Sequence, residues 1–381
     1  MDLDYVVIPA CILLIGVVVI WLSIRRMRSL SVLVSRRWRR VVERIVLSGV
    51  VVVTTVVAVS ASYNAAALYW FRVHNPAPGV IYNVDGHKMR LDCMGSGAPT
   101  IILESGLGNG GLIWAGVQPE LAKTTRVCAY DRAGLGWSDR SDEARDADHI
   151  ASQLHGLLME AKITGPIVLM GHSIAGIYMR DYATRFPEGL EGIVFVDGST
   201  PLQDDNPAFK AEIGSKLKIL VMVGLERAAY IVGVPRLVSH FSDLIPNFEP
   251  HTKKMFLEDY LHTHFGVVGD EIEGVHASGL ETVKTGPYGS TPILIFSQDP
   301  MKSLPKQNPP QRTVMMAKVW GQMQEDLKKL STRSRRIVAK DSTHYIQLDR
   351  PDLIKKEVPA FIEQIRGAAP EPAVYGTTIT E

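Results

Sequence analysis

The sequence predicts an α/β fold with a mostly parallel β-sheet, a helical cap inserted within it, and two apolar helices in front. Three observations lead to this class. Short, wholly apolar runs alternate with longer segments of helical length, as expected for parallel strands that are buried on both faces. A long interval, residues 199–290, lacks strong strand alternation. Two uncharged apolar runs precede the first of these elements.

Overall composition excludes some classes of partner. The chain has 381 residues and a formal net charge of +1, so its length allows one large domain or two ordinary ones. A near-neutral chain has no overall attraction for nucleic acid, and we expect no nucleic-acid partner. The charges are unevenly spread, and the asymmetry lies near the N-terminus.

The two uncharged runs near the N-terminus predict a pair of transmembrane helices. Residues 5–22 carry no charge, and residues 45–71 are also uncharged. A transmembrane helix needs roughly 20 predominantly apolar residues, so we place the spans at about residues 5–22 and 45–66. The loop between them holds one acid, Glu43, and eight arginines: Arg25, Arg26, Arg28, Arg36, Arg37, Arg39, Arg40 and Arg44.

Short basic loops between spans stay in the cytoplasm. This rule predicts a hairpin of residues 1–71 with both ends outside, and therefore a multi-pass protein of the cell membrane whose large domain is extracytoplasmic. A signal peptide is an alternative: if translation begins at Met27, Val59 and Ala61 suit a cleavage site. A hairpin buried in a soluble protein is a third interpretation. The first two interpretations agree that the large domain is exported.

The large domain is predicted to follow a linker at residues 72–79, which contain proline and glycine. Asp85 and Gly86 lie between two alternating runs and predict a β-hairpin at the start of the domain. Buried strands and helical segments then alternate. The strand-like runs are TIILES, TRVCAYD, PIVLMG, GIVFVD, PILIFS and RRIVAKD. We place the domain at residues 80–367, with the cap at about 199–290, and expect residues 368–381 to form a disordered tail.

A serine stands where one of these strands meets a helix. Residues 171–175 approximate the G-x-S-x-G pattern of a nucleophile elbow, with Ala175 in place of the last glycine. Small residues allow the tight bend that exposes the serine side chain. Ser173 is therefore the candidate nucleophile, and the backbone N–H of Ile174, at the start of the helix, is a candidate oxyanion donor.

A serine nucleophile needs a base and an acid, which follow it in the order serine, acid, histidine. His344 comes after the last predicted strand and just before a helix, and it is the candidate base. Asp299 follows the strand before His344 and is the favoured acid. Asp197, one strand earlier, is the alternative acid, and Asp341 is expected to shape the loop.

A second oxyanion donor is expected from a glycine-rich segment after the strand TIILE. We call residues 105–111, SGLGNGG, the glycine loop. Its candidate donor is the backbone N–H of Leu107. The chain has no G-x-x-x-x-G-K-[ST] pattern, which disfavours phosphate binding at this loop. Arg132, in the turn YDRAGLGWSD, is expected to brace a loop rather than to react.

Together these segments resemble the α/β-hydrolase fold family. The landmarks LESGLG, YDRAGLGWSD, GHSIAG, FSQDP and STHYIQLDRPD occur in family order over about residues 80–367. The resemblance implies an eight-stranded sheet, a Ser173–Asp299–His344 triad, and hydrolysis without a metal or organic cofactor. The sequence departs from the family at Ala175 and at Ser105, where many relatives have histidine.

The resemblance has two further consequences. The family's strand order places the strand of Cys93 beside that of Cys128, so the resemblance allows a disulfide between these two cysteines. The implied activity is that of a serine hydrolase, and we expect it to act on a carboxylic ester. The N-terminal apolar runs predict that it is membrane-anchored, and apolar stretches of the cap, LKILVMVG and AAYIVGVPRLV, predict a small, lipophilic substrate. An amidase, or a peptidase similar to proline iminopeptidases, is the alternative with the same triad. A non-catalytic binding module is the alternative from another class, and the intact serine, acid and histidine disfavour it.

Overall fold

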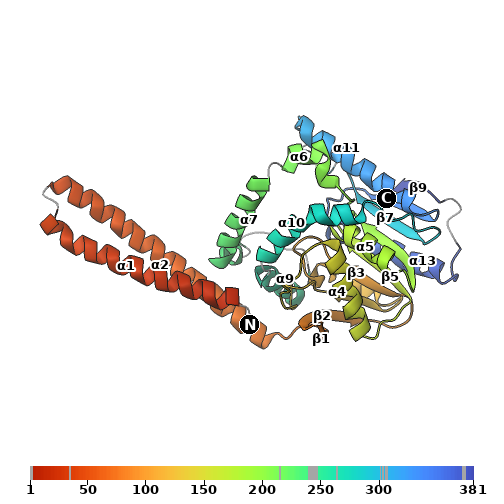
Figure 1. Ribbon diagram of the computed structural model, residues 1–381, viewed down its shortest axis with the longest axis horizontal. Coiled ribbons are helices and arrows are strands. Elements are labelled where there is room, and N and C mark those ends of the chain that lie inside the picture. Colours follow the sequence, from red (N-terminus) through yellow and green to blue (C-terminus); the bar gives the residue numbers. More distant parts are fainter. Residues whose placement is uncertain are drawn as a thin grey trace. The chain divides into compact units, whose positions relative to one another are not determined.

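The computed structural model describes residues 3–33, 36–213, 216–238, 248–262, 265–300, 302, 304, 308–370 and 375–381 (Figure 1). The chain divides into two compact units. The first comprises residues 1–76 together with residues 224–245, and the second comprises residues 77–223 and 246–381. Each unit is described by itself below.

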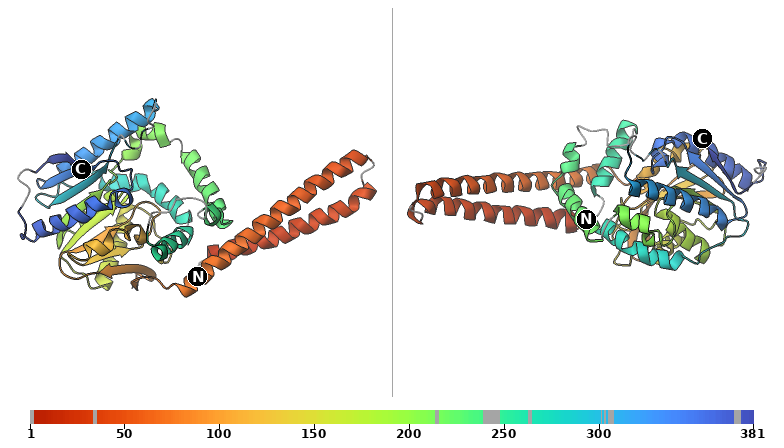
Figure 2. Two further views of the ribbon diagram at one scale, coloured as in Figure 1. Left: turned by 180° about the vertical axis from the view of Figure 1, so that it is seen from behind. Right: turned by 90° about the horizontal axis from the view of Figure 1, so that it is seen from above.

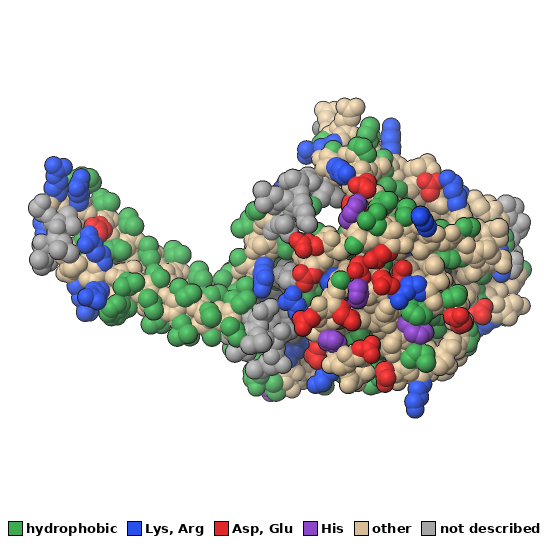
Figure 3. Space-filling view, viewed as in Figure 1, with side chains coloured by type: hydrophobic (Ala, Val, Ile, Leu, Met, Phe, Trp, Pro, Cys, Tyr) green, Lys and Arg blue, Asp and Glu red, His purple; other side chains and the backbone are tan. Residues whose placement is uncertain are grey.

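The first unit is built on two long helices that pack side by side, α1 (Leu3–Leu33) and α2 (Arg37–His74). Both are long and apolar enough to cross a membrane, by length and composition. Gly16 of α1 lies against Thr54 and Ala58 of α2, because small residues let the two backbones approach. Most other apolar side chains of the hairpin face outward, and basic side chains gather at its loop end (Figure 3).

The cap segment 224–245 belongs to this first unit. It includes the end of α7 (Lys216–Ile231) and the short helix α8 (Val234–Val238). Asn64 of α2 donates a hydrogen bond to the carbonyl oxygen of Tyr230, and Arg236 donates to the side-chain oxygen of Asn64. The segment expected as one cap is therefore shared between the two units. The helix α2 also extends to His74, into the expected linker.

The second unit contains one nine-stranded sheet with helices on both faces (Figure 2). The strand order is β1-β2-β4-β3-β5-β6-β7-β8-β9. Strands β3 to β9 pair in parallel, and β1 and β2 are antiparallel, as the hairpin signal predicted. The predicted α/β class is confirmed. The strands are β1 (Val80–Val84), β2 (His87–Met94), β3 (Thr100–Glu104), β4 (Val127–Tyr130), β5 (Ile167–His172), β6 (Leu190–Val196), β7 (Ile293–Gln298), β8 (Ser334–Ala339) and β9 (Thr377–Thr380).

The ninth strand corrects two expectations, an eight-stranded sheet and a disordered tail. Residues 377–380 extend the sheet by pairing in parallel with β8, and Ile379 lies opposite Ile337. The segment TTIT contains one apolar residue, so it lacks the apolar run that marked the other strands. Threonine is β-branched and suits an edge strand. Residues 371–374 of the expected tail lie outside the described residues.

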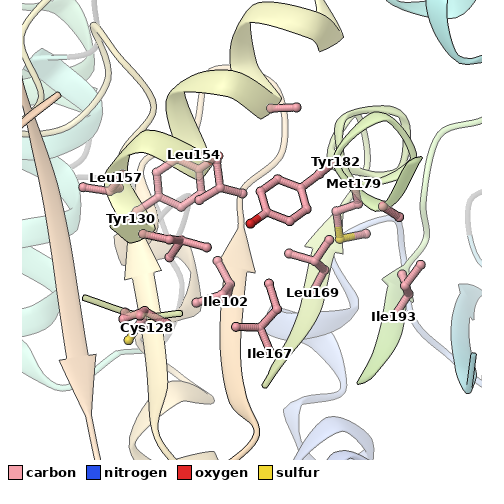
Figure 4. Close-up of a cluster of buried hydrophobic side chains, with 14 of the residues drawn as sticks. Ile102, Cys128, Tyr130, Leu154, Leu157, Ile167, Leu169, Met179, Tyr182 and Ile193 are labelled. Carbon is pink, nitrogen blue, oxygen red and sulfur yellow. The ribbon is translucent and has the colours of Figure 1, made fainter. Parts of the chain in front are cut away.

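Side chains alternate between the two faces of the sheet and form two cores. Ile102 and Leu169 face α4 and α5 (Figure 4). Ile101 and Val168 face α3 and α13 on the opposite side of the sheet. This is the period of two that strands impose. The helices around the sheet are η1 (Gly111–Trp114), α3 (Gln118–Leu121), α4 (Ala147–Glu160), α5 (Ala175–Arg185), α11 (Gln311–Asp326), η3 (Leu327–Leu330), α12 (Ile346–Asp349) and α13 (Pro351–Ile365).

The described residues between β6 and β7, where the cap was expected, are mainly helical. The helices are η2 (Gln203–Asp205), α6 (Pro207–Ile213), α7, α8, α9 (Pro250–His262) and α10 (Phe265–Thr282).

Cys93 of β2 and Cys128 of β4 lie opposite each other in the sheet and form a disulfide.

Candidate active site

Ser173 lies on a sharp bend between β5 and α5. Its backbone φ is +58°, in the left-handed region that residues other than glycine rarely adopt. The bend is held from both sides: the N–H of Ser173 donates to the carbonyl of Val196, and its own carbonyl accepts from Ser199 at 2.7 Å. The chain thus holds a strained backbone in place with neighbouring loop and strand, as functional sites often do.

The small residues around Ser173 have a measurable steric role. A Cβ on Gly176 would lie 2.6 Å from the carbonyl oxygen of Ser199, and a Cβ on Gly171 would lie 2.7 Å from the Cβ of Ala175. Both distances are shorter than van der Waals contact allows. Ala175 itself is fully buried and fits. The glycine that the bend requires on the helix side is therefore Gly176, one residue beyond the pattern.

His344 reaches Ser173 from the other side of the site, from the loop between β8 and α12. Its Nε2 lies 2.9 Å from the Oγ of Ser173, within hydrogen-bonding distance. The side chain of His344 is about one third exposed, at 32%. The sequence therefore located both the candidate nucleophile and the candidate base, and the structure brings them together.

The acid partner of His344 is Asp197, and the preference for Asp299 was wrong. The Nδ1 of His344 lies 2.6 Å from Oδ2 of Asp197, which follows β6. With Nε2 directed at Ser173, both ring nitrogens are occupied. Asp299 follows β7 as expected, but its carboxylate accepts the backbone N–H of Asp341 at 3.1 Å and so shapes the loop before His344.

Asp197 is well suited to hold the imidazole. Its side chain is fully buried, and its second oxygen accepts hydrogen bonds from the backbone N–H of Gln298 and from Nε1 of Trp320, each at 2.9 Å. A buried carboxylate requires such partners. Trp320 also presents its ring edge-on to His344, with ring centroids 5.4 Å apart. Trp320 comes from α11, and no motif in the sequence marks it.

His172, next to the serine, holds the backbone of the base. Its Nε2 lies 2.9 Å from the carbonyl oxygen of His344, which can only accept, so Nε2 carries the proton. Burial, and then the proximity of His344, hold the pKa of His172 well below its usual value. His172 is therefore a neutral donor that fixes the loop of His344.

The two predicted oxyanion donors flank Ser173. The glycine loop passes close to the serine, since a Cβ on Gly106 would lie 3.4 Å from the Cβ of Ser173. Ile174 is the first residue beyond the serine, at the N-terminus of α5. Over the described part of the chain, the N–H groups of Leu107 and Ile174 donate to no protein acceptor. Both are available to a ligand oxygen.

Apolar side chains surround this polar centre. Leu107, and Val275 of α10, both pack against a buried apolar cluster that includes Ile174. On the side of His344, Trp320 packs against Phe209 of α6, with ring centroids 5.7 Å apart. The polar groups at the centre of the site thus have apolar neighbours on two sides.

Comparisons with known proteins agree with the fold. The sequence model of a family described as "alpha/beta hydrolase fold" matches residues 99–216. The uncharacterized protein YbdG of Bacillus subtilis (strain 168) is 33% identical over 127 residues, which cover 33% of this chain and 39% of YbdG. The chain thus aligns with about two fifths of that relative's length.

Two solved structures share the fold. An esterase from Exiguobacterium antarcticum has a TM-score of 0.54 at 15% identity, covering 75% of this chain and 99% of the esterase. A thermophilic esterase from Thermogutta terrifontis has a TM-score of 0.50 at 18% identity, covering 76% and 99%. At these identities the likeness concerns the fold alone. The family match over residues 99–216 and the shared fold support an α/β-hydrolase fold for this chain.

Proposed function

We propose that the protein is a membrane-anchored serine hydrolase that cleaves a carboxylic ester with a lipophilic group. The observation that carries this proposal is the continuous hydrogen-bonded chain from Ser173 through His344 to Asp197, with distances of 2.9 and 2.6 Å. A hydroxyl, an imidazole and a buried carboxylate in this order are the parts that acyl transfer requires.

In the proposed mechanism, the Oγ of Ser173 attacks the ester carbonyl carbon and its proton passes to Nε2 of His344. Asp197 stabilises the imidazolium that forms. The carbonyl electrons move to the oxygen, and the N–H groups of Leu107 and Ile174 bind this oxyanion. The C–O bond then breaks, and His344 returns the proton to the leaving alcohol. Water, activated by His344, hydrolyses the acyl-enzyme by the same steps.

The proposed lipophilic substrate is supported by the apolar side chains beside the nucleophile. Phe209 and Trp320 lie on the side of the base, and Leu107 and Val275 pack against the apolar cluster that includes Ile174. The proposed anchor also favours such substrates, because lipophilic molecules concentrate in membranes. The support for the anchor is the length and apolar exterior of α1 and α2.

The test is a series of p-nitrophenyl esters of increasing acyl length, assayed below micelle-forming concentrations. We expect kcat/KM to rise from acetyl towards medium chains, by up to about fourfold per methylene, until the pocket is full. The Ser173→Ala variant controls for background hydrolysis and should be inactive. A steady fall from acetyl onward would argue for a small or polar substrate.

The same assay separates the alternatives. Matched anilides and N-terminal proline peptides that are cleaved faster than the esters would favour an amidase or a peptidase similar to proline iminopeptidases. A folded wild type that hydrolyses none of these compounds would contradict the enzyme and favour a binding module.

A further inference from the structure

A buried cluster of charged side chains lies beneath the glycine loop, and the triad does not use it. Its centre is Arg132, which is 2% exposed. Arg132 forms ion pairs with Glu104 at the end of β3 and with Glu271 of the cap helix α10, at 2.6 and 2.8 Å. Arg145 forms a second ion pair with Glu271 at 2.7 Å. Burying so many charges is costly unless each is paired, which is the case for these groups.

Arg132 holds two carbonyl groups of the glycine loop. Its Nη1 donates to the carbonyl oxygen of Ser105 at 2.6 Å, and its Nη2 donates to that of Gly106 at 2.8 Å. The peptide bond between Gly106 and Leu107 is trans. In a trans peptide the C=O and the next N–H point in opposite directions. The N–H of Leu107 therefore points away from Arg132, and the position of the guanidinium sets that direction.

Glu271 holds Arg132 in place and touches the loop itself. Its Oε1 accepts from Nε of Arg132 at 2.8 Å, and its Oε2 accepts from Nη2 at 3.1 Å. This two-point contact fixes the plane of the guanidinium. Oε2 also accepts the backbone N–H of Gly108 at 2.9 Å. One carboxylate of the cap helix thus binds the loop directly and through Arg132.

The charge state of Glu271 is suited to this role. Burial alone would disfavour its carboxylate form, but the charges of Arg132 and Arg145 outweigh burial and lower the pKa of Glu271 to about 2. The same carboxylate, with Glu104, raises the pKa of Arg132 well above its usual value in spite of burial. The pair is therefore ionised over the whole neutral range.

We propose that Glu271 is a positioning residue that orients the oxyanion donor Leu107 through Arg132 and Gly108. This inference rests on the proposed function, because it assigns Leu107 N–H to the ester oxyanion. It links α10, a part of the cap, to the geometry of the catalytic centre. A donor that is turned away from the oxyanion loses transition-state binding and leaves ground-state binding of the substrate almost unchanged.

The test compares Glu271→Gln with Arg145→Gln in the full chain, in detergent. Glu271→Gln breaks the ion pairs of Glu271 with Arg132 and with Arg145, whereas Arg145→Gln breaks only the second of these. The hydrogen bonds of Arg145 include none to the glycine loop. We expect Glu271→Gln to lower kcat by about tenfold or more with KM changed less than threefold. Arg145→Gln should change kcat less than threefold. A trifluoromethyl ketone, which forms an oxyanion on the serine, should bind Glu271→Gln weaker by the same factor as kcat falls.

A second variant covers the case in which Glu271→Gln does not fold. Arg132→Lys keeps the charge opposite Glu271, but one ammonium cannot reproduce the guanidinium fork, so it should show the same selective loss of kcat. Equal kcat values for the Glu271 and Arg145 variants, or a loss confined to KM, would overturn the positioning role. A folded wild type without turnover would instead contradict the proposed function.

Discussion

The candidate site depends on Asp197, which binds the base His344. Strand ends offered three aspartates to His344, and all three satisfied the required chain order. The structure separates them by contact: Asp197 binds the imidazole, and Asp299 binds the backbone of Asp341. Burial agrees, because Asp197 is fully buried and is held by Trp320. A carboxylate so fixed sets the tautomer of His344 that Ser173 requires.

Asp197→Asn should lower kcat/KM by about 10³- to 10⁴-fold, because an amide no longer stabilises the imidazolium and favours the wrong tautomer. The measurement is ester hydrolysis at pH 7. Asp299→Asn is the matched control, at the equivalent place one strand along, and should change kcat/KM less than tenfold. The assignment of Asp197 is wrong if the Asp299 variant is the more damaging of the two.

Residue by residue, the sequence predicted the nucleophile and the base of the candidate triad and not its acid. Ser173 and His344 follow from local patterns, a strand-to-helix bend and a loop after the last apolar run. The acid depends on which of two parallel strands ends nearer to His344, and spacing along the chain does not contain that distance. Trp320 and Glu271 come from helices far along the chain, and their roles depend entirely on tertiary contact.

At the scale of elements, the bend before α5 depends on Gly176, because a glycine has no side chain to clash with the neighbouring backbone. Gly176 packs against the backbone of Ser199 and Gly198, which follow β6 and Asp197. This close contact therefore holds the nucleophile elbow at Ser173 together with the loop that carries Asp197. The G-x-S-x-G pattern pointed to position 175, where alanine is accommodated.

Gly176→Ala should destabilise the fold by about 1–3 kcal/mol, because its Cβ meets backbone that cannot move aside cheaply. It should also lower kcat by shifting Ser173. Thermal unfolding and ester hydrolysis measure the two effects. Gly321→Ala in α11 is the control, since its Cβ would meet nothing within 4 Å and alanine favours helices. Unchanged stability and activity in Gly176→Ala would contradict this account of the elbow.

The ion pairs of α10 give a pH dependence with a definite sign. The pKa of Glu271 is about 2 in the folded protein, below its ordinary value of 4.5. The unfolded chain therefore binds more protons between these values. The stabilisation is fully present above about pH 4.5 and is lost as the pH falls towards 2.

The check is thermal unfolding of wild type and Glu271→Gln, followed by tryptophan fluorescence at pH 7 and at pH 3. The gap between their melting temperatures should be wide at pH 7 and narrower at pH 3. A gap of the same width at both values would show that the carboxylate is not held ionised by Arg132 and Arg145.

At the scale of the whole molecule, the hairpin and the disulfide suggest the same compartment. Residues 25–44 are rich in arginine and lie between the two uncharged runs, at the end of α1 and the start of α2. Short basic segments between spans stay in the cytoplasm. The disulfide between Cys93 and Cys128 suits an oxidising environment outside it. The apolar runs predicted α1 and α2, but no sequence pattern predicted that residues 224–245 join them.

A C-terminal tag should therefore be digested when protease is added to intact cells, because the proposed topology places every residue after the hairpin outside. A cytoplasmic protein in the same cells should survive as the control. A tag that is protected until the membrane is opened would contradict the topology and leave the chemistry of the site untouched.

The central claim is that Ser173 is acylated with the help of His344 and Asp197. The most direct measurement is mass spectrometry of the full chain after reaction with a fluorophosphonate, followed by mapping of the modified peptide. We predict one adduct per chain, on Ser173, with no adduct in Ser173→Ala and strongly slowed labelling in His344→Ala and Asp197→Asn. A folded wild type that is not labelled, or an adduct on any other residue, would contradict the claim.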